Sequence, residues 1–305
     1  AYGTITIPIT VIKNGAGPTL SFTGGVHGDE YEGPIALMKL ARELQPQDIT
    51  GRVIIIPSLN LPAVQAGTRC SPIDGLNLNR VFPGRHDGSV TETIAHYITT
   101  ELAPLSDVHL DLHSGGTTLE YLPTIFAGRF EDRDLENKHF EAAMAFGAEV
   151  TILLDNFPDG GRFLTSVFEK TGALKFSTEL GGAGKVNPVN VRMAEQGVRN
   201  LMKYFRVMAG EIITAQLQGR EAPRLANVES VECYVIAPDD GLYEPFIDLG
   251  DEITENQIIG QVHYPQHHDK SPMVVTASRS GFLLCKRPPG KVMRGDNIAI
   301  IAQPV

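Results

Sequence analysis

The sequence is poor in cysteine and in basic residues. Its 305 residues include only three cysteines, Cys70, Cys233 and Cys285, which lie far apart. Such a set forms neither a disulfide framework nor a zinc ribbon, and it predicts a protein of the reducing cytoplasm. The 26 basic residues are outnumbered by 36 acidic ones, which gives a net charge of -10. Nucleic-acid binding is therefore not expected, because phosphate binding needs a basic face.

Long apolar runs are also missing. None approaches the roughly 18 to 20 residues that a membrane span needs, so no membrane partner is expected. A hydrophobic fraction of 42% and a charged fraction of 20% are those of an ordinary globular protein. The length suffices for one large domain of roughly 200 residues and a smaller one.

Short β-rich runs alternate with helical segments up to about Met208. This alternation predicts an α/β domain over residues 1–215, with a mostly parallel sheet flanked by helices. Ligands of such sheets bind outside the carboxyl ends of the strands. The expected strands are Ile5 to Ile12, Leu20 to Thr23, Arg52 to Ile56, Val108 to Leu112, Val150 to Leu154 and Leu174 to Thr178. The expected helices are Gly33 to Leu44, Thr91 to Leu102 with Thr91 as N-cap, Asp132 to Phe146, and Val189 to Met208.

The pattern changes after about Gly219, where glycine and proline interrupt short apolar runs. Three positions recur 40 residues later: Gly241, Gly250 and Ile258 become Gly281, Gly290 and Ile298. This duplication predicts a small all-β domain over residues 216–305, a barrel or sandwich of paired hairpins. The domain resembles the biotinyl/lipoyl barrel-sandwich, but no E-M-K-M-like carrier sequence is present. We interpret it as a structural or assembly module that carries no cofactor.

His27 and Glu30 directly follow the Leu20 to Thr23 strand. Three residues apart, they point to the same side of a helical turn or tight loop. An imidazole and a carboxylate are ligands of catalytic zinc, which takes a third protein ligand and leaves one position for water. The alternative is a surface helix start, with Asp29 and Glu30 near the positive helix end.

His113 ends an apolar strand and precedes two glycines. It is the natural third ligand of a His₂Glu set that binds one zinc ion per chain. Asp111 shares its strand face and can accept a hydrogen bond from it. We interpret His109, deeper on that face, as a packed histidine. The alternative for His113 is a strand-end residue without a role.

Glu179 repeats this layout, since a β-run leads to an acidic residue and a glycine pair. A carboxylate at such a strand end is where the general base of a zinc hydrolase belongs. The alternative is an exposed strand-end glutamate.

Arg69 and the stretch Asn77 to Gly84 lie in a long connection rich in proline and glycine. Loops of this length inside compact domains are usually functional. Arginine suits a substrate carboxylate or a developing oxyanion. The alternative is a salt-bridged surface loop.

Together these motifs resemble the succinylglutamate desuccinylase/aspartoacylase family, a branch of the zinc carboxypeptidase-like enzymes. The resemblance covers about Leu20 to Phe205 through G-G-x-H-G-x-E, N-x-N-R-x-F, D-x-H and a strand-end Glu before glycine. It implies a carboxypeptidase-like fold whose β-rich C-terminal domain helps cover the active site. It also implies these roles: zinc ligands His27, Glu30 and His113, catalytic base Glu179, carbonyl-polarising Arg69, and Asn79 with Arg80 on the substrate α-carboxylate.

Two departures, together with the longer motifs G-G-x-H-G-D-E-Y-E-G-P-I-A-L, T-R-x-S-P-I-D-G-x-N-L-N-R-x-F-P-G and D-L-H-S-G-G, make the chain more similar to the ectoine-degradation branch of this family. Aspartoacylases usually read D-L-N-R and H-G-N-E where this chain has N-L-N-R from Asn77 and H-G-D-E from His27. The branch implies a zinc-dependent amidohydrolase that removes a short acyl group, foremost acetyl, from a small N-acyl amino acid, here N-acetyl-L-2,4-diaminobutyrate. Glu120 and, less directly, Asp155 are candidate partners for the ammonium of that substrate; both can instead be solvated loop acids.

Other functions stay open at this point. The substrate could be N-succinylglutamate, N-acetylaspartate or a peptide cleaved from its carboxyl end. A more distant alternative is a catalytically dead binding protein on the same fold. Cobalt or manganese would fit much the same ligands as zinc. The oligomeric state is open too, a homo-oligomer included.

Overall fold

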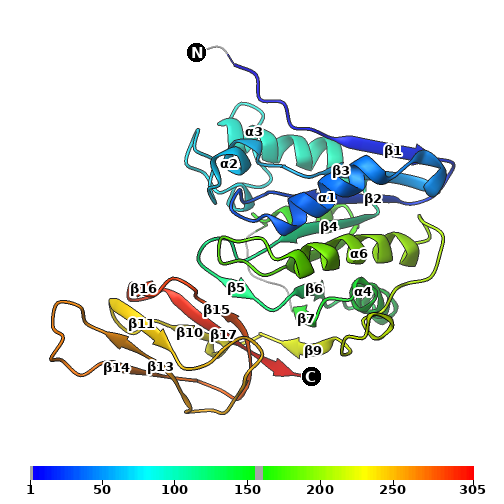
Figure 1. Cartoon of the computed structure of the whole chain (residues 1–305). Helices are drawn as coiled ribbons and strands as arrows, with labels where there is room; N and C mark the ends of the chain where they lie inside the picture. The colour runs from blue at the N-terminus through cyan, green and yellow to red at the C-terminus, as the bar shows by residue number, and fades with distance from the viewer. Residues whose placement is uncertain (1–2, 155–160) are drawn as a thin grey trace.

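The computed structural model describes residues 3–154 and 161–305, so Asp155 lies outside the described residues. The chain has a mixed α/β fold, with one large mixed sheet, flanking helices and a second, antiparallel sheet (Figure 1). In the described part of the chain, none of the helices combines the length and apolar character needed to cross a bilayer. The helices are α1 (Glu32–Glu43), α2 (Leu61–Ala66), α3 (Val90–Tyr97), α4 (Arg133–Phe146), α5 (Leu164–Lys170) and α6 (Pro188–Tyr204).

The large sheet has 13 strands, and its main path is β1-β3-β2-β4-β8-β6-β7-β9-β17-β15-β12. Neighbours are parallel from β3 through β2 and β4 to β8, and again from β6 through β7 to β9. The strands up to β9 are β1 (Thr10–Asn14), β2 (Thr19–Gly24), β3 (Gly51–Ile56), β4 (Val108–His113), β5 (Glu120–Tyr121), β6 (Thr124–Gly128), β7 (Val150–Leu154), β8 (Leu174–Glu179) and β9 (Arg224–Asn227).

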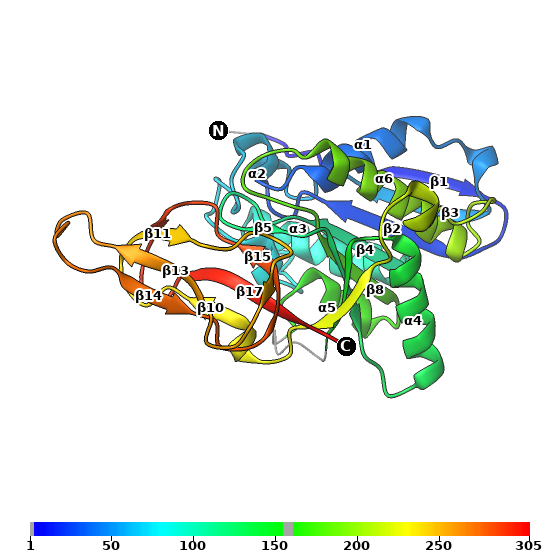
Figure 2. The same ribbon diagram turned by 60° about the horizontal axis from the view of Figure 1, so that its bottom comes forward.

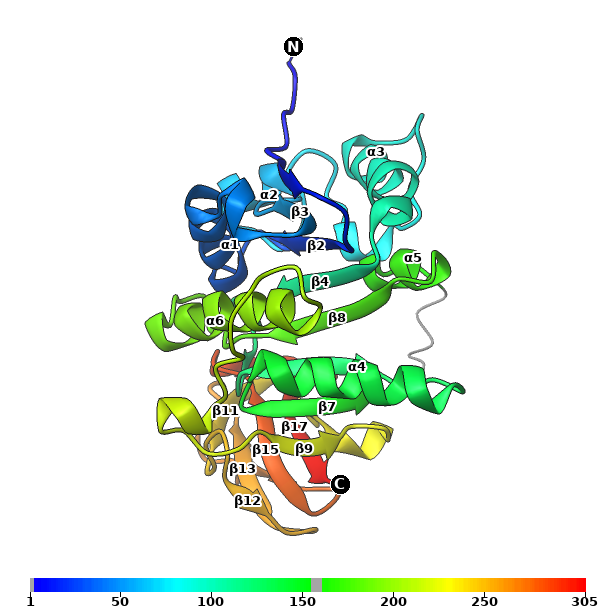
Figure 3. The same cartoon turned by 90° about the vertical axis from the view of Figure 1, so that its right-hand side faces the viewer.

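The two faces of the central strands bury different kinds of side chain. On β4, Val108, Leu110 and Leu112 pack in one apolar core with α1, α4 and α6. Because side chains alternate along a strand, His109 and His113 point to the opposite face, toward α5. Figure 3 shows α1 and α6 on one side of the molecule and α3 and α5 on the other. The polar residues of the site therefore lie on the α5 side.

The 40-residue echo is a structural duplication. The first unit contains β11, β12 and β13, and the second contains β15, β16 and β17. The short middle strand of each unit pairs with the first strand of the other unit: β16 pairs with β11, and β12 pairs with β15. The strands are β10 (Tyr234–Ile236), β11 (Gly241–Pro245), β12 (Glu252–Ile253), β13 (Ile258–His263), β14 (Met273–Thr276), β15 (Gly281–Lys286), β16 (Lys291–Val292) and β17 (Asn297–Pro304).

This β-rich part projects from the molecule at β11, β13 and β14 (Figure 2). Its junction with the rest is a continuous sheet, because β9 pairs with β7 on one side and with β17 on the other. β5 adds a second junction through its pairing with β15. The large sheet thus runs across the boundary expected near residue 215.

Several expected elements differ in their ends. The first strand begins at Thr10 and not at Ile5. The N-cap of α3 is Ser89, which forms a capping box with Glu92, and not Thr91. Thr91 lies inside the first turn, where its backbone and hydroxyl both donate to Asp74. A cap needs non-helical dihedral angles, and these occur at Ser89, two residues earlier than expected.

Candidate active site

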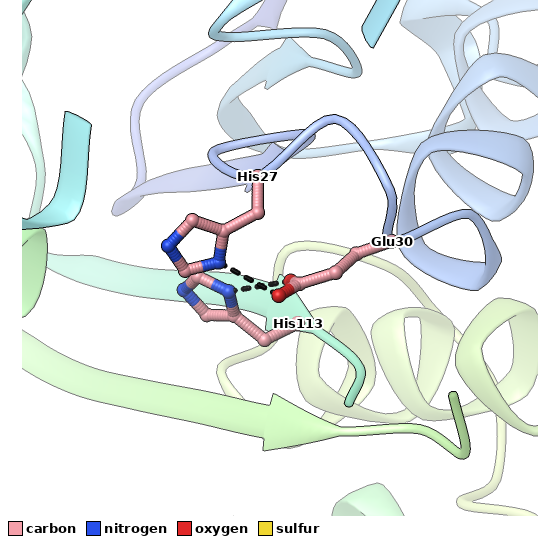
Figure 4. Close-up of side chains that lie close together, drawn as sticks. All are labelled: His27, Glu30 and His113. Atoms are coloured by element: carbon pink, nitrogen blue, oxygen red, sulfur yellow. Dashed lines mark hydrogen bonds and ion pairs between the residues drawn. The ribbon is translucent and has the colours of Figure 1, made fainter. Parts of the chain in front are cut away.

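Glu30 lies between two histidines, as Figure 4 shows. Its Oε1 is 2.7 Å from Nδ1 of His27, and its Oε2 is 2.7 Å from Nδ1 of His113. One ligand atom from each of the three residues falls within 4.8 Å of the others, and all three residues are buried. Two imidazoles and a carboxylate are the donor set of a catalytic zinc site, so these residues fit zinc.

The backbone brings His27, Glu30 and His113 together through adjacent parallel strands. His27 and Glu30 follow the end of β2, and His113 is the last residue of the neighbouring β4. Gly28 lets this loop pack against α2, since a Cβ there would lie 2.0 Å from the Ala63 carbonyl. A larger residue at Gly28 would displace the ligand loop.

Charges inside this cluster shift its pKa values in opposite directions. Burial raises the Glu30 pKa, but the His27 and His113 imidazoles outweigh it and hold the pKa well below its usual range. Burial lowers the His113 pKa, but the carboxylates of Asp111 and Glu30 raise it well above its usual value. Opposite charges a few ångströms apart in a buried site produce such shifts. The cluster therefore favours a cation beside Glu30.

Behind the ligands, polar contacts hold the β4 histidines. Asp111 Oδ2 is 2.6 Å from Nε2 of His113, as expected for a carboxylate that supports a ligand. His109 stacks on Phe168 at 3.5 Å and meets the Ser21 hydroxyl through Nδ1 at 2.9 Å. Burial lowers its pKa to about 4. His109 is therefore a packed neutral histidine, which confirms the interpretation from the sequence.

Glu179 stands beside His113, its partner in the parallel register of β4 and β8. Its Oε2 is shielded from solvent and has no hydrogen-bond partner among the described residues. Burial and the nearby charge of Glu30 raise its pKa to about 8. A shielded carboxylate with a raised pKa at such a position is suited to accept a proton.

The long connection after β3 brings three more side chains to the cluster around Glu30: Arg69, Asn79 and Arg80. Arg69 Nη1 lies 3.3 Å from Glu30 Oε1, with 45% of its side chain exposed. Asn79 Oδ1 accepts from the Leu164 backbone at 2.8 Å, which leaves the amide nitrogen as the end of Asn79 able to donate. Arg80 stacks over Phe163 at 4.5 Å.

A cavity of about 300 Å³ connects these side chains. Seven of the residues expected from the sequence line it: His27, Arg69, Asn79, Arg80, Asp111, His113 and Glu179. Others were not expected: Phe126, Phe163, Ser177, Val228 and Tyr234. The period of two along β8 could have indicated Ser177, which shares the face of Glu179. No local signal marks Tyr234, which arrives from a strand far along the chain.

Glu120 is placed apart from these residues. It lies in β5, outside the set of described residues that line the cavity. Its Oε1 is 2.7 Å from Lys185 Nζ, and its Oε2 is 3.7 Å from Lys286 Nζ. The structure therefore does not bring Glu120 together with the other expected site residues.

Comparison with known proteins identifies the family of this chain. The succinylglutamate desuccinylase/aspartoacylase catalytic domain matches residues 16–205. The chain belongs to this family. It is 43% identical, over its whole length and 88% of the relative, to an N-alpha-acetyl-L-2,4-diaminobutyric acid deacetylase of Halomonas elongata.

Solved structures of family members share the fold of the whole chain. A succinylglutamate desuccinylase/aspartoacylase from Rhodobacter sphaeroides is 38% identical, with a TM-score of 0.94 over 100% of this chain and 91% of that one. The product-bound ectoine utilization protein EutE (DoeB) from Ruegeria pomeroyi is 38% identical, with a TM-score of 0.93 over 99% and 90%. The family's fold thus extends through the β-rich C-terminal region of this chain.

Proposed function

We propose that this chain is a zinc-dependent amidohydrolase that removes the acetyl group from N-α-acetyl-L-2,4-diaminobutyrate. The observation that carries the proposal is the position of Glu179 in one cavity with His27 and His113, the two histidines that the Glu30 carboxylate joins. The identity of 43% to a deacetylase of that substrate supports the choice of acyl amino acid.

Each residue has a part that follows from its contacts. Zinc held by His27, Glu30 and His113 would supply Lewis-acid polarisation of the scissile carbonyl and a more acidic water. Glu179 accepts the proton of the attacking water and passes it to the leaving nitrogen. Arg69 faces the negative charge that develops on the carbonyl oxygen, a contribution of roughly 3 to 4 kcal/mol for one donor elsewhere.

Asn79 and Arg80 orient the substrate by its α-carboxylate. The Asn79 amide can donate into the cavity because its oxygen is engaged by Leu164. Stacking on Phe163 holds the Arg80 guanidinium at the cavity wall. Two donors on one carboxylate fix the direction of the substrate and supply much of the orientation benefit.

Three further points belong to this proposal. The fold is carboxypeptidase-like, and residues 216–305 form a β-rich domain that helps cover the site, supported by Val228 and Tyr234 in the cavity wall. The enzyme works in the cytoplasm. We do not assign Glu120 to the substrate ammonium, since two lysines already engage it.

The test combines metal analysis with amine release from N-acetyl-diaminobutyrate, N-acetylaspartate and N-succinylglutamate. We expect about one zinc per chain and the fastest release from the diaminobutyrate compound. Glu179→Ala should lower kcat by at least about 100-fold, because general-base catalysis contributes that much, while zinc content stays unchanged. The control is Glu43→Ala, a glutamate on the exposed end of α1.

Each outcome bears on a different part of the proposal. Full zinc with near-normal kcat in Glu179→Ala would remove Glu179 as the base. Preference for an acidic substrate would keep the mechanism and change the substrate. Rates on a peptide series that rise with chain length would favour a carboxypeptidase. Wild-type protein with neither zinc nor turnover would overturn the whole proposal.

A further inference from the structure

The side-chain oxygen of Asn77 makes two contacts that join the metal site to the substrate loop. It lies 3.1 Å from Nε2 of His27. It also accepts a hydrogen bond of 2.9 Å from the backbone of Asn79. That second bond caps the short turn Leu78–Arg80, which carries both Asn79 and Arg80. One oxygen atom thus contacts a metal ligand and a substrate-binding turn.

These contacts show that Nε2 of His27 carries a proton. A backbone N–H can only donate, so the Asn77 atom that caps the turn is the carbonyl oxygen and not the amide nitrogen. A carbonyl oxygen can only accept, so His27 Nε2 must be the donor. A neutral ring with its proton on Nε2 has its lone pair on Nδ1, the atom that faces Glu30. This is the tautomer that metal binding at Nδ1 requires.

We propose that Asn77 is a positioning residue that accepts a hydrogen bond from Nε2 of His27 and ties this ring to the turn of Asn79 and Arg80. The inference rests on the proposed zinc site. It adds that metal affinity and substrate affinity both depend on the Asn77 side chain, so that removing this side chain lowers both. Partners of this kind orient a ligand, and their loss typically costs 10- to 100-fold in metal affinity.

The second histidine ligand has a different support. His113 Nε2 meets the Asp111 carboxylate at 2.6 Å, whereas His27 Nε2 meets the neutral Asn77 amide at 3.1 Å. Hydrogen bonds to an ionised acceptor are shorter and stronger than those to a neutral one. The hydrogen bond that supports His27 is therefore the weaker of the two. A charged partner in place of Asn77 should strengthen it and raise the metal affinity.

The experiment measures zinc affinity of the metal-free protein by competition with a chromophoric chelator, alongside KM for the acetylated substrate. Asn77→Ala should lose about 10- to 100-fold in zinc affinity and also raise KM. Asn77→Asp keeps an acceptor for both donors and should hold or exceed wild-type zinc affinity. The matched control is Asn187→Ala, because Asn187 caps α6 through Val189 at 2.9 Å without touching a ligand.

A measurement on the wild-type protein tests the inference without any variant. Nitrogen-15 NMR of the zinc-loaded protein should show the His27 Nε2 proton protected from exchange with solvent; rapid exchange of this proton would overturn the inference. Zinc affinity in Asn77→Ala equal to that of wild type would overturn it as well. Wild-type protein that binds no zinc would instead overturn the proposed function, so the two failures are distinguishable.

Discussion

The α/β region and the C-terminal β-rich region bury their strands differently. All six residues of β4 are buried, whereas only one of the four residues of β14 is. Parallel strands covered on both faces end at the same edge of the sheet, which brings His113 beside Glu179. The antiparallel strands of the duplicated units alternate in direction, so their carboxyl ends do not meet at one edge of a sheet. Strand direction, more than β content, decides where a site can form.

The two regions nevertheless share one cavity wall and one sheet. Val228 and Tyr234 reach the cavity from the C-terminal side. β17 pairs with β9, and β15 pairs with β5. We therefore expect the β-rich region to contribute side chains to the cavity wall. We also expect it to unfold together with the α/β region.

The largest expected effect comes from matched core truncations in the two regions. Leu110 and Ile301 are both fully buried, in separate apolar clusters. Replacing either with Ala should lower the free energy of unfolding by about 2 to 5 kcal/mol, because a cavity is left behind. Urea unfolding measured by circular dichroism should show one transition in both variants.

Val274→Ala is the control for these truncations. Val274 is 51% exposed, and its loss should change stability by no more than about 0.5 kcal/mol. Two separate transitions in Ile301→Ala would show that residues 216–305 unfold on their own, despite the shared sheet.

A smaller effect is expected on the pH dependence of stability, in which a buried histidine of the α/β region should differ from a histidine of the β-rich region. His139 on α4 is buried, donates through Nε2 to the Lys175 carbonyl at 2.6 Å, and accepts at Nδ1 from the Gly128 backbone. Burial lowers its pKa. Since the unfolded chain then binds the proton more readily, stability should fall as pH drops below about 6.5, by at most about 1.4 kcal/mol per pH unit.

His139→Gln should remove this part of the pH dependence, as measured by urea unfolding between pH 7.5 and 5.5. His263→Gln is the comparison from the β-rich region, where the exposed ring lies 2.8 Å from Glu244. An unchanged pH slope in His139→Gln would show that the ring is not held neutral by the fold.

The smallest effect is expected where the two regions touch at Glu120. Glu120→Gln weakens contacts with Lys185 and Lys286, one of them on β15. Ion pairs of this kind contribute about 1 kcal/mol or less, so stability should barely change. KM for N-acetyl-diaminobutyrate should also stay near the wild-type value. A tenfold rise in KM at unchanged stability would instead restore Glu120 as the ammonium partner.

Local patterns in the sequence predicted much of the fold and most of the candidate site. The strands that became β2, β3, β4, β7 and β8 were expected from apolar runs, and their ends differ by no more than a residue. The 40-residue echo predicted the duplicated β-units. His27, Glu30, His113 and Glu179 were found because each lies at or just after the end of a strand that is marked by a glycine-rich turn.

Contacts between distant segments were not predictable in this way. Tyr234 enters the cavity, and Asp74 holds the start of α3, through packing that no short window of sequence encodes. Glu120 was expected in the site because it follows His113 closely in the chain. The structure turns it toward lysines that lie 65 and 166 positions further along.

The sequence by itself determined five strands of the large sheet, and that His27, Glu30, His113 and Glu179 stand at strand ends, because hydrophobic periodicity and turn residues act over a few positions. Only the tertiary structure decided which strands are neighbours, and hence that His113 pairs in register with Glu179. It also decided that Asn77 meets His27, 50 positions earlier in the chain. Strand order and loop packing arise from burial summed over the whole chain, which no local pattern records.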